Sequence, residues 1–164
     1  MVAIRALREG DPEVISEAFT AIGWDKPVRQ YEKYLAEQVA GVRDVLVASV
    51  DGEFAGYVTV YWVSPYEPFN GIPEISDFNV LPKFRRRGIG NGLMDAAEAR
   101  VAERSEVVGI GVGLYADYGT AQRMYVRRGY VPDGRGLIYD GKQVPPGEMV
   151  RNDDSATLMF TKAL

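Results

Sequence analysis

The residues best suited to chemistry lie in one short segment, Arg85-Arg86-Arg87-Gly88-Ile89-Gly90. It follows an apolar run that ends at Pro82, and a helical pattern of apolar residues begins at Leu93. Glycines let the backbone approach a ligand closely, and unpaired N–H groups at a helix start point toward negative oxygen atoms. Arginines add charge-assisted hydrogen bonds that suit phosphate. The segment therefore predicts a site for a phosphorylated ligand.

This cationic segment contrasts with an acidic chain. The 164 residues carry a formal net charge of −4, with 46% hydrophobic and 26% charged residues, as in a globular protein. The charge argues against nucleic acid as a main partner. No apolar stretch is long enough to span a bilayer and no cationic, apolar leader is visible, so we expect a cytoplasmic protein with no membrane partner. The length suits a single domain over residues 1–164.

The chain has no histidine and no cysteine, which limits its chemistry more than its size does. Zinc sites built from these ligands, Ser-His-Asp triads and Cys-His pairs are excluded, and no metal is expected. A general base must then be a carboxylate, a lysine, a tyrosine, a terminal amine or water. No serine lies in a Gly-x-Ser-x-Gly context, so a covalent acyl-enzyme is not expected either.

The elements that must position this segment form an α/β pattern. Asp51-Gly52 predicts a hairpin, Asp11-Pro12 predicts a capped helix start, and residues 64–73 and 132–148 are expected to be mainly loop. Strands are expected at 3–7, 45–50, 54–63, 74–81, 107–115, from 130–131, and at 156–162, with helices at 11–22, 26–39, 88–104 and 119–128. Because hairpins and crossovers both occur, we expect a mixed sheet with helices on its faces.

This order of elements and two motifs resemble the GNAT superfamily of acetyl-CoA-dependent N-acetyltransferases. The first motif, Val80 to Gly90, is similar to the family's acetyl-CoA signature of Gln or Arg, two free positions, Gly, one free position, and Gly or Ala. The second, Ala121 to Tyr130, is similar to the family's later helix and following strand. The resemblance covers nearly the whole chain. It implies one N-acetyltransferase domain with a central mixed, mostly antiparallel sheet flanked by helices on both faces.

The resemblance also implies roles for individual residues. The amides of the segment Arg85 to Gly90 would hold the pyrophosphate of CoA, and backbone groups around Phe78 and Val80 would pair with the pantetheine arm where two central strands separate. Tyr125 stands where many members have a tyrosine that protonates the departing thiolate. Glu74 stands where some members have a carboxylate base. The family often has asparagine where this chain has Tyr118, and Asp117 is the neighbouring substitute.

Elementary chemistry agrees with these roles but leaves alternatives open. An amine must lose a proton before it attacks a thioester, and a buried carboxylate such as Glu74 can accept that proton through water. Glu74 could instead lie in water at the strand mouth or pair with an arginine. Asp77 is the rival base, but strand alternation places it on the opposite face. Tyr125 is a suitable acid, since a phenol has a pKa of about 10; alternatively its ring packs in the core.

The acceptor is expected to be a primary amine of a small molecule or peptide, acetylated by direct transfer in a ternary complex with a backbone N–H, that of Val80, on the oxyanion. An acidic protein attracts polyamines, aminoglycosides or basic peptide ends more readily than anions. Two alternatives are a non-catalytic acyl-CoA-binding or sensing domain and an interaction module. A homodimer through exposed C-terminal strands is also considered. Candidate walls of the acceptor site are Trp24, Asp25, Tyr31, Tyr34, Tyr61, Trp62, Tyr66, Glu67 and Phe69.

Overall fold

The chain forms one eight-stranded sheet with the strand order β1-β2-β3-β4-β5-β8-β6-β7, in a computed structural model that describes residues 1–164. Only β4 and β5 are parallel neighbours, and every other pair is antiparallel. The expected mixed, mostly antiparallel sheet is therefore confirmed. The strands are β1 (Val2–Ala6), β2 (Arg43–Val50), β3 (Glu53–Tyr61), β4 (Glu74–Val80), β5 (Val107–Gly113), β6 (Val131–Tyr139), β7 (Lys142–Gln143) and β8 (Ala156–Ala163).

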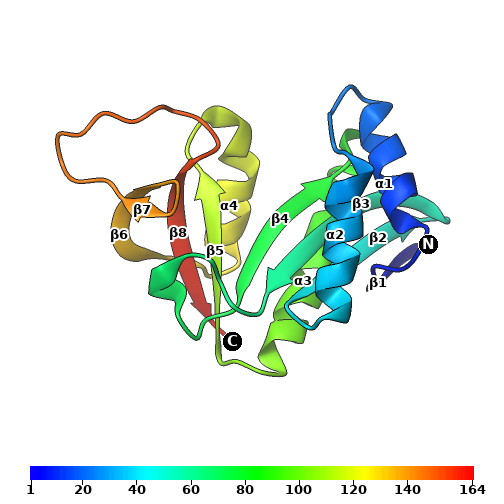
Figure 1. Ribbon diagram of the computed structural model, residues 1–164, viewed down its shortest axis with the longest axis horizontal. Coiled ribbons are helices and arrows are strands. Elements are labelled where there is room, and N and C mark those ends of the chain that lie inside the picture. The colour runs from blue at the N-terminus through cyan, green and yellow to red at the C-terminus, as the bar shows by residue number, and fades with distance from the viewer.

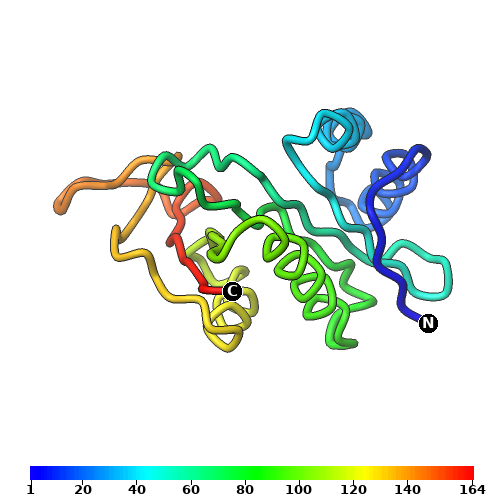
Figure 2. Tube along the Cα trace, turned by 90° about the horizontal axis from the view of Figure 1, so that it is seen from below, coloured from blue at the N-terminus to red at the C-terminus, as the bar shows by residue number.

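Four helices cover the two faces of the sheet, as predicted. Figure 2 shows α1 and α2 on one face and α3 and α4 on the other. No helix combines the length and apolar character needed to cross a membrane. The helices are α1 (Asp11–Thr20), α2 (Val28–Val39), α3 (Ile89–Ala102) and α4 (Gly119–Arg127), with short 3₁₀ turns η1 (Glu67–Phe69), η2 (Pro82–Phe84) and η3 (Ala116–Tyr118).

Helical spacing of apolar residues fixes α3 against the sheet. Leu93, Ala97 and Val101 recur every four residues, and all three are fully buried. Each large apolar side chain that is buried in this way contributes roughly 1.5–3 kcal/mol. Because α3 is anchored by this stripe, the turn between the end of β4 and the N-terminus of α3 is held in place.

The Asp51-Gly52 hairpin between β2 and β3 is confirmed. Both residues have positive φ, 49° for Asp51 and 85° for Gly52, which suits a two-residue turn between twisted strands. The start of α1 differs from its prediction, because Gly10 is the N-cap and Asp11 is the first helical residue. The Asp11 carboxylate instead accepts hydrogen bonds from the Arg8 amide and the Arg5 guanidinium.

The expectation of loop over residues 132–148 was wrong in part. Strand β6 continues to Tyr139 and is followed by the short β7. The pairing of β6 with β8 shifts register between Pro132 and Leu137, so the apolar alternation that marks a strand is interrupted. The final strand β8 lies between β5 and β6 and is not an exposed edge, contrary to the expectation for the C-terminal strands.

The parallel neighbours β4 and β5 pair for only a short distance. Their register is limited to Glu74 with Gly109 and Ile75 with Ile110, after which the two strands separate (Figure 1). Beyond that point β4 stays paired with β3 and β5 stays paired with β8. The sheet therefore has a V-shaped opening at its centre, and both sequence motifs lie beside it.

A bulge in β4 lies at this opening. Thr59 pairs with Ser76 and Tyr57 pairs with Asn79, so Asp77 and Phe78 together oppose one residue of β3. Asp77 has a φ of 50°, a left-handed conformation that few non-glycine residues adopt. The extra residue reverses the alternation of side chains beyond Ser76. The prediction that Asp77 faces away from Glu74 was wrong for this reason.

Candidate active site at the separation of β4 and β5

The turn before α3 presents a run of free backbone donors. The amides of residues 86–91 have no hydrogen-bond acceptor within the protein, whereas the Arg85 amide donates to Pro82 and the Gly92 amide to Gly88. Arg86 and Gly88 adopt positive φ values of 59° and 80°, which turn successive amides toward one side. These amides and the N-terminus of α3 form a cradle for an anion, and the predicted position of the phosphate site fits this geometry.

The arginines of this turn differ in their freedom. All three are exposed at the surface. Arg85 donates from Nε to the Val80 carbonyl oxygen at 3.0 Å, and the guanidinium of Arg87 lies 5.4 Å from the centre of the Phe84 ring. Arg86 has neither a hydrogen bond nor an ion pair, so its whole guanidinium is available to a ligand. Gly90 lies inside the cradle, where a Cβ atom would come within 3.2 Å of the Phe78 ring.

Two adjoining cavities occupy the V-shaped opening. The α4 chamber, about 300 Å³, is lined by Phe78, Tyr118 and Tyr125 among others, and the β7 chamber, about 610 Å³, by Tyr66, Glu74 and Asp140 among others. Six residues line both, so the chambers share a wall. The shared residues are Ile75, Ser76, Asp77, Gly111, Asp154 and Thr157.

Glu74 lies at the closed end of the V and lines the β7 chamber. Its side chain is buried, and its Oε1 accepts a hydrogen bond from the Ser64 hydroxyl at 2.6 Å. Burial raises the pKa of the Glu74 carboxyl, and this effect outweighs the Ser64 hydrogen bond and the charge of Arg43. Neither an ion pair nor bulk solvent accounts for Glu74, so both alternatives considered from the sequence are wrong.

Tyr125 lines the α4 chamber from α4. It is buried, its hydroxyl makes no hydrogen bond within the protein, and its ring centre is 5.8 Å from that of Tyr130. Burial raises the pKa of the Tyr125 hydroxyl above its ordinary value of about 10. The hydroxyl is therefore protonated at neutral pH and is free to donate. Tyr125 and Glu74 lie in different chambers, on either side of the shared wall.

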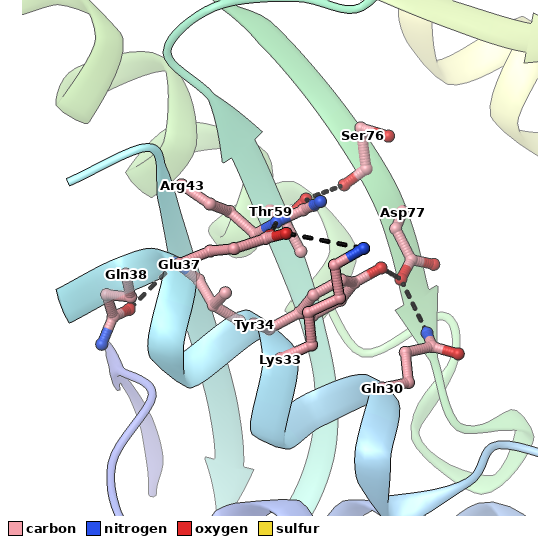
Figure 3. A network of polar contacts seen from close by, with 10 residues as sticks. Gln30, Lys33, Tyr34, Glu37, Gln38, Arg43, Thr59, Ser76 and Asp77 are labelled. Atoms are coloured by element: carbon pink, nitrogen blue, oxygen red, sulfur yellow. Dashed lines mark hydrogen bonds and ion pairs between the residues drawn. The ribbon is translucent and has the colours of Figure 1, made fainter. Parts of the chain in front are cut away.

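Asp77 stands in that wall and is held by neutral donors. Its Oδ2 accepts from the Tyr34 hydroxyl at 2.7 Å and the Tyr57 hydroxyl at 2.8 Å, and its Oδ1 accepts from Asn79 at 3.0 Å. The contact with Tyr34 of α2 is visible in Figure 3. Burial, followed by the Asp77 charge, raises the pKa of Tyr34. The bulge and these donors fix the carboxylate between the two chambers.

Arg43 braces the same face of the sheet. It donates to Glu37 of α2 at 2.6 Å and to the Thr59 hydroxyl at 2.8 Å (Figure 3). Its guanidinium lies 4.1 Å from the centre of the Tyr34 ring and 3.9 Å from that of Tyr61. The Thr59 hydroxyl in turn donates to the Ser76 carbonyl oxygen at 2.9 Å. This chain of contacts couples α2 to the β4 bulge.

Of the residues expected to contact the pantetheine arm, Phe78 lines the α4 chamber and Val80 lies further along β4. The Val80 carbonyl oxygen is already bonded to Arg85. At the position where the family often has asparagine, Tyr118 lines the α4 chamber and donates to Asp154 at 2.8 Å. Asp117 is exposed and outside both chambers, so it does not replace that asparagine.

Most of the aromatic residues that were expected to line the acceptor site have other structural roles. Tyr31 of α2 is fully buried, and the Phe69 ring covers Gly109, where a Cβ atom would come within 2.3 Å of that ring. Of the nine candidates, only Tyr66 lines the β7 chamber. Asp140 and Asp154, which do line it, were missed because they lie in a segment that the sequence marked as loop and in the segment just after it.

Comparison with known proteins places this geometry in a class. The sequence model of the Acetyltransferase (GNAT) family matches residues 12–130. A protein of Archaeoglobus fulgidus described as an uncharacterised N-acetyltransferase is 36% identical over 85 residues, which cover 51% of this chain and 56% of that relative. The chain thus spans little more than half the length of this relative.

Solved structures share the whole fold at low identity. A GNAT-family acetyltransferase of Desulfovibrio desulfuricans has a TM-score of 0.75 at 15% identity, covering 99% of each chain. A ribosomal-protein-alanine N-acetyltransferase of Brucella melitensis has a TM-score of 0.72 at 20% identity, again covering 99% of each. An acetyltransferase of Salmonella typhimurium, solved with acetyl-CoA, has a TM-score of 0.70 at 18% identity, covering 99% of this chain and 93% of that one.

The fold is that of solved acetyltransferases. The chain belongs to the GNAT acetyltransferase family, because the family's sequence model matches well over half of it. The resemblance carried by the two sequence motifs is therefore confirmed.

Proposed function

We propose that this protein is an N-acetyltransferase that moves the acetyl group of acetyl-CoA to a primary amine of a small molecule or peptide, within a ternary complex. The observation that carries this proposal is the shared wall of the two chambers, with an unpaired phenol on one side and a buried carboxylate of raised pKa on the other. Two reactants that enter from the two chambers meet at Ser76 and Asp77.

The turn at residues 85–90 fits the diphosphate of CoA, because its free amides and Arg86 offer donors and positive charge together. Bound there, acetyl-CoA supplies the thioester that is consumed in the reaction. Phe78 and the backbone near Val80 would contact its pantetheine arm on the way into the α4 chamber. A backbone N–H of β4 beside the shared wall is the proposed donor to the oxyanion; Val80, expected in this role from the sequence, lines neither chamber.

Glu74 accepts a proton from the acceptor ammonium through water, which leaves a neutral amine able to attack. The new C–N bond forms as the C–S bond breaks, and Tyr125 donates its proton to the departing sulfur. The nitrogen loses its second proton as it becomes the amide, and this proton returns through water to the Tyr125 phenolate. The net products are therefore the amide, the thiol and the proton held by Glu74. Positioning of the two reactants by the chambers lowers the entropic part of the barrier.

Two measurements test the proposal. Acetyl-CoA should raise the melting temperature of the protein, since a ligand that binds only the native state stabilises it. Thiol release should then appear with some members of a panel of primary amines. Tight binding of acetyl-CoA without thiol release for any amine would favour a non-catalytic sensing domain, and no thermal shift would refute both functions.

A further inference from the structure

The β7 chamber carries more negative charge than the protein neutralises. Four carboxylates line it, those of Glu74, Asp77, Asp140 and Asp154, and no lysine or arginine does. None of the four forms an ion pair. Elsewhere the protein pairs its buried carboxylates, as with Glu98.

Glu74 is an incompletely satisfied group within this chamber. Its side chain is more than nine-tenths buried, with an exposed fraction of 8%. Ser64 donates to Oε1, and Oε2 has no donor from the protein. Oε2 is reachable from outside the protein, so it is open to a water molecule or to a donor that a ligand brings.

The groups nearest to the other carboxylates do not remove the excess charge. Tyr34 and Tyr57 hold Asp77 in place but are neutral. Asp154 accepts hydrogen bonds from Tyr115 and Tyr118, which are also neutral. These bonds, and to a smaller extent the charge of Lys26, lower the pKa of Asp154, but Lys26 lines the α4 chamber and not the β7 chamber. The charge of Arg43 lowers the pKa of Glu74, but the Arg43 guanidinium is already bonded to Glu37.

From this charge distribution we infer that the acceptor is an aliphatic diamine or polyamine, a substrate class that rests on the proposed N-acetyltransferase function. One nitrogen lies at the shared wall beside Glu74 and Asp77, where it loses its proton and is acetylated. A second nitrogen stays an ammonium ion, since alkylamines have a pKa near 10.4, and lies between Asp140 and Asp154 at the exposed rim. A volume of about 610 Å³ admits such a chain.

The test compares three four-carbon amines that differ in the charge of the far end, together with one peptide acceptor. The probes are 1,4-diaminobutane, 1-aminobutane, 4-aminobutanoate and a neutral tripeptide with a free N-terminus, assayed for thiol release at fixed ionic strength. We expect kcat/KM for the diamine to exceed that for the monoamine by about ten-fold, and 4-aminobutanoate, whose far end is a carboxylate, to be the poorest acceptor. Equal or higher values for the monoamine or the neutral peptide would overturn the inference.

Asp140→Asn sharpens the comparison, because asparagine tolerates the left-handed conformation of Asp140, whose φ is 51°. It should reduce the diamine-to-monoamine ratio by about three-fold, as one rim charge is lost. The matched control is Asp117→Asn, an exposed carboxylate outside the chambers, which should leave the ratio unchanged. A ratio that is equally unaffected by both variants would contradict the inference.

A binding measurement separates this inference from the proposed function. Each amine is titrated calorimetrically into the full-length protein saturated with CoA. If no amine is acetylated but the diamine binds about ten-fold more tightly than the monoamine, the acetyl-transfer proposal fails and the diamine site stands. Equal affinities refute the diamine site even if acetylation is observed.

Discussion

The turn at residues 85–90 presents backbone, whereas the β7 chamber presents side chains. The turn offers consecutive amides from one short segment, at the end of a helix anchored by its apolar stripe. The chamber combines carboxylates from β4, the β6–β7 turn and the segment before β8. The amides of the turn suit a part of the ligand that is always the same. Substitutions among the side chains of the β7 chamber can change the specificity without disturbing the turn.

The largest expected effect is on the chemical step, which takes place between the turn at residues 85–90 and the β7 chamber. Tyr125→Phe should lower kcat by about 10²–10³-fold, because it removes the proton donor to the departing sulfur. The dissociation constant for acetyl-CoA should change by less than about two-fold, since the turn at residues 85–90 is untouched. Single-turnover kinetics and calorimetry measure the two quantities.

Tyr130→Phe is the matched control for Tyr125→Phe. Tyr130 is also buried and lies beside Tyr125, but its hydroxyl contacts Glu98 at 3.2 Å and does not line either chamber. Its loss should leave kcat nearly unchanged. Wild-type kcat in Tyr125→Phe would remove Tyr125 from the mechanism.

The next effect is that of Glu74→Gln, which should lower the activity and raise the stability of the fold. Glu74→Gln should lower kcat/KM by about 10²-fold, and in the wild type kcat/KM should rise with pH through the raised pKa of Glu74. Since that pKa is higher in the folded state, Glu74 favours folding below its unfolded pKa of about 4.3, and this stability is lost as the pH rises through the folded pKa. Glu74→Gln should therefore raise the melting temperature at pH 7.

Glu98→Gln is the comparison for this stability effect, because Glu98 is as buried as Glu74 but paired. Burial alone would raise the pKa of Glu98, but Arg128 and Lys162 outweigh it and hold that pKa below its usual value. Glu98 thus stabilises the fold above its unfolded pKa, and this contribution is lost as the pH falls through the folded pKa. Thermal unfolding at pH 7 should show Glu98→Gln less stable than the wild type, and the same loss in Glu74→Gln would contradict the assignment.

A smaller effect tests the turn at residues 85–90 alone. Gly88→Ala should weaken acetyl-CoA binding by about ten-fold, because a side chain disfavours the φ of 80° that orients the amides. Gly10→Ala is the matched control, since Gly10 is the left-handed N-cap of α1 with a φ of 87°. Both variants should lose roughly 1 kcal/mol of stability. Calorimetry should show weaker binding only for Gly88→Ala, and equal weakening in both would assign the effect to general strain.

The smallest expected effect is that of a single exposed charge. Arg86→Gln should weaken acetyl-CoA binding by about three-fold at low salt and less at high salt, because the guanidinium is exposed and screened. Arg151→Gln, also exposed but remote in sequence from the turn, serves as the control. Binding that does not depend on salt in the wild type would limit the turn's contribution to its neutral amides.

The turn at residues 85–90 could be predicted because its determinants are neighbours in the sequence. A strand end, arginines, a glycine with positive φ and a helix start fall within a few residues, so local rules describe the whole feature. The same holds for the Asp51-Gly52 hairpin and for the apolar stripe of α3. The position of Asp77 could not be predicted, because one extra residue in β4 reverses the faces and nothing in the local sequence marks the bulge.

By itself, the sequence determined the order of the helices and of the strands other than β7, the absence of histidine and cysteine chemistry, and the turn at residues 85–90 before a helix. Only the tertiary structure decided which carboxylates share a cavity, because Glu74, Asp140 and Asp154 are brought together by the separation of β4 from β5 and by β6 and β8 beside it. The physical reason is that periodicity and turn propensities act over a few residues. The charge of a cavity instead depends on how distant strands are placed in the sheet.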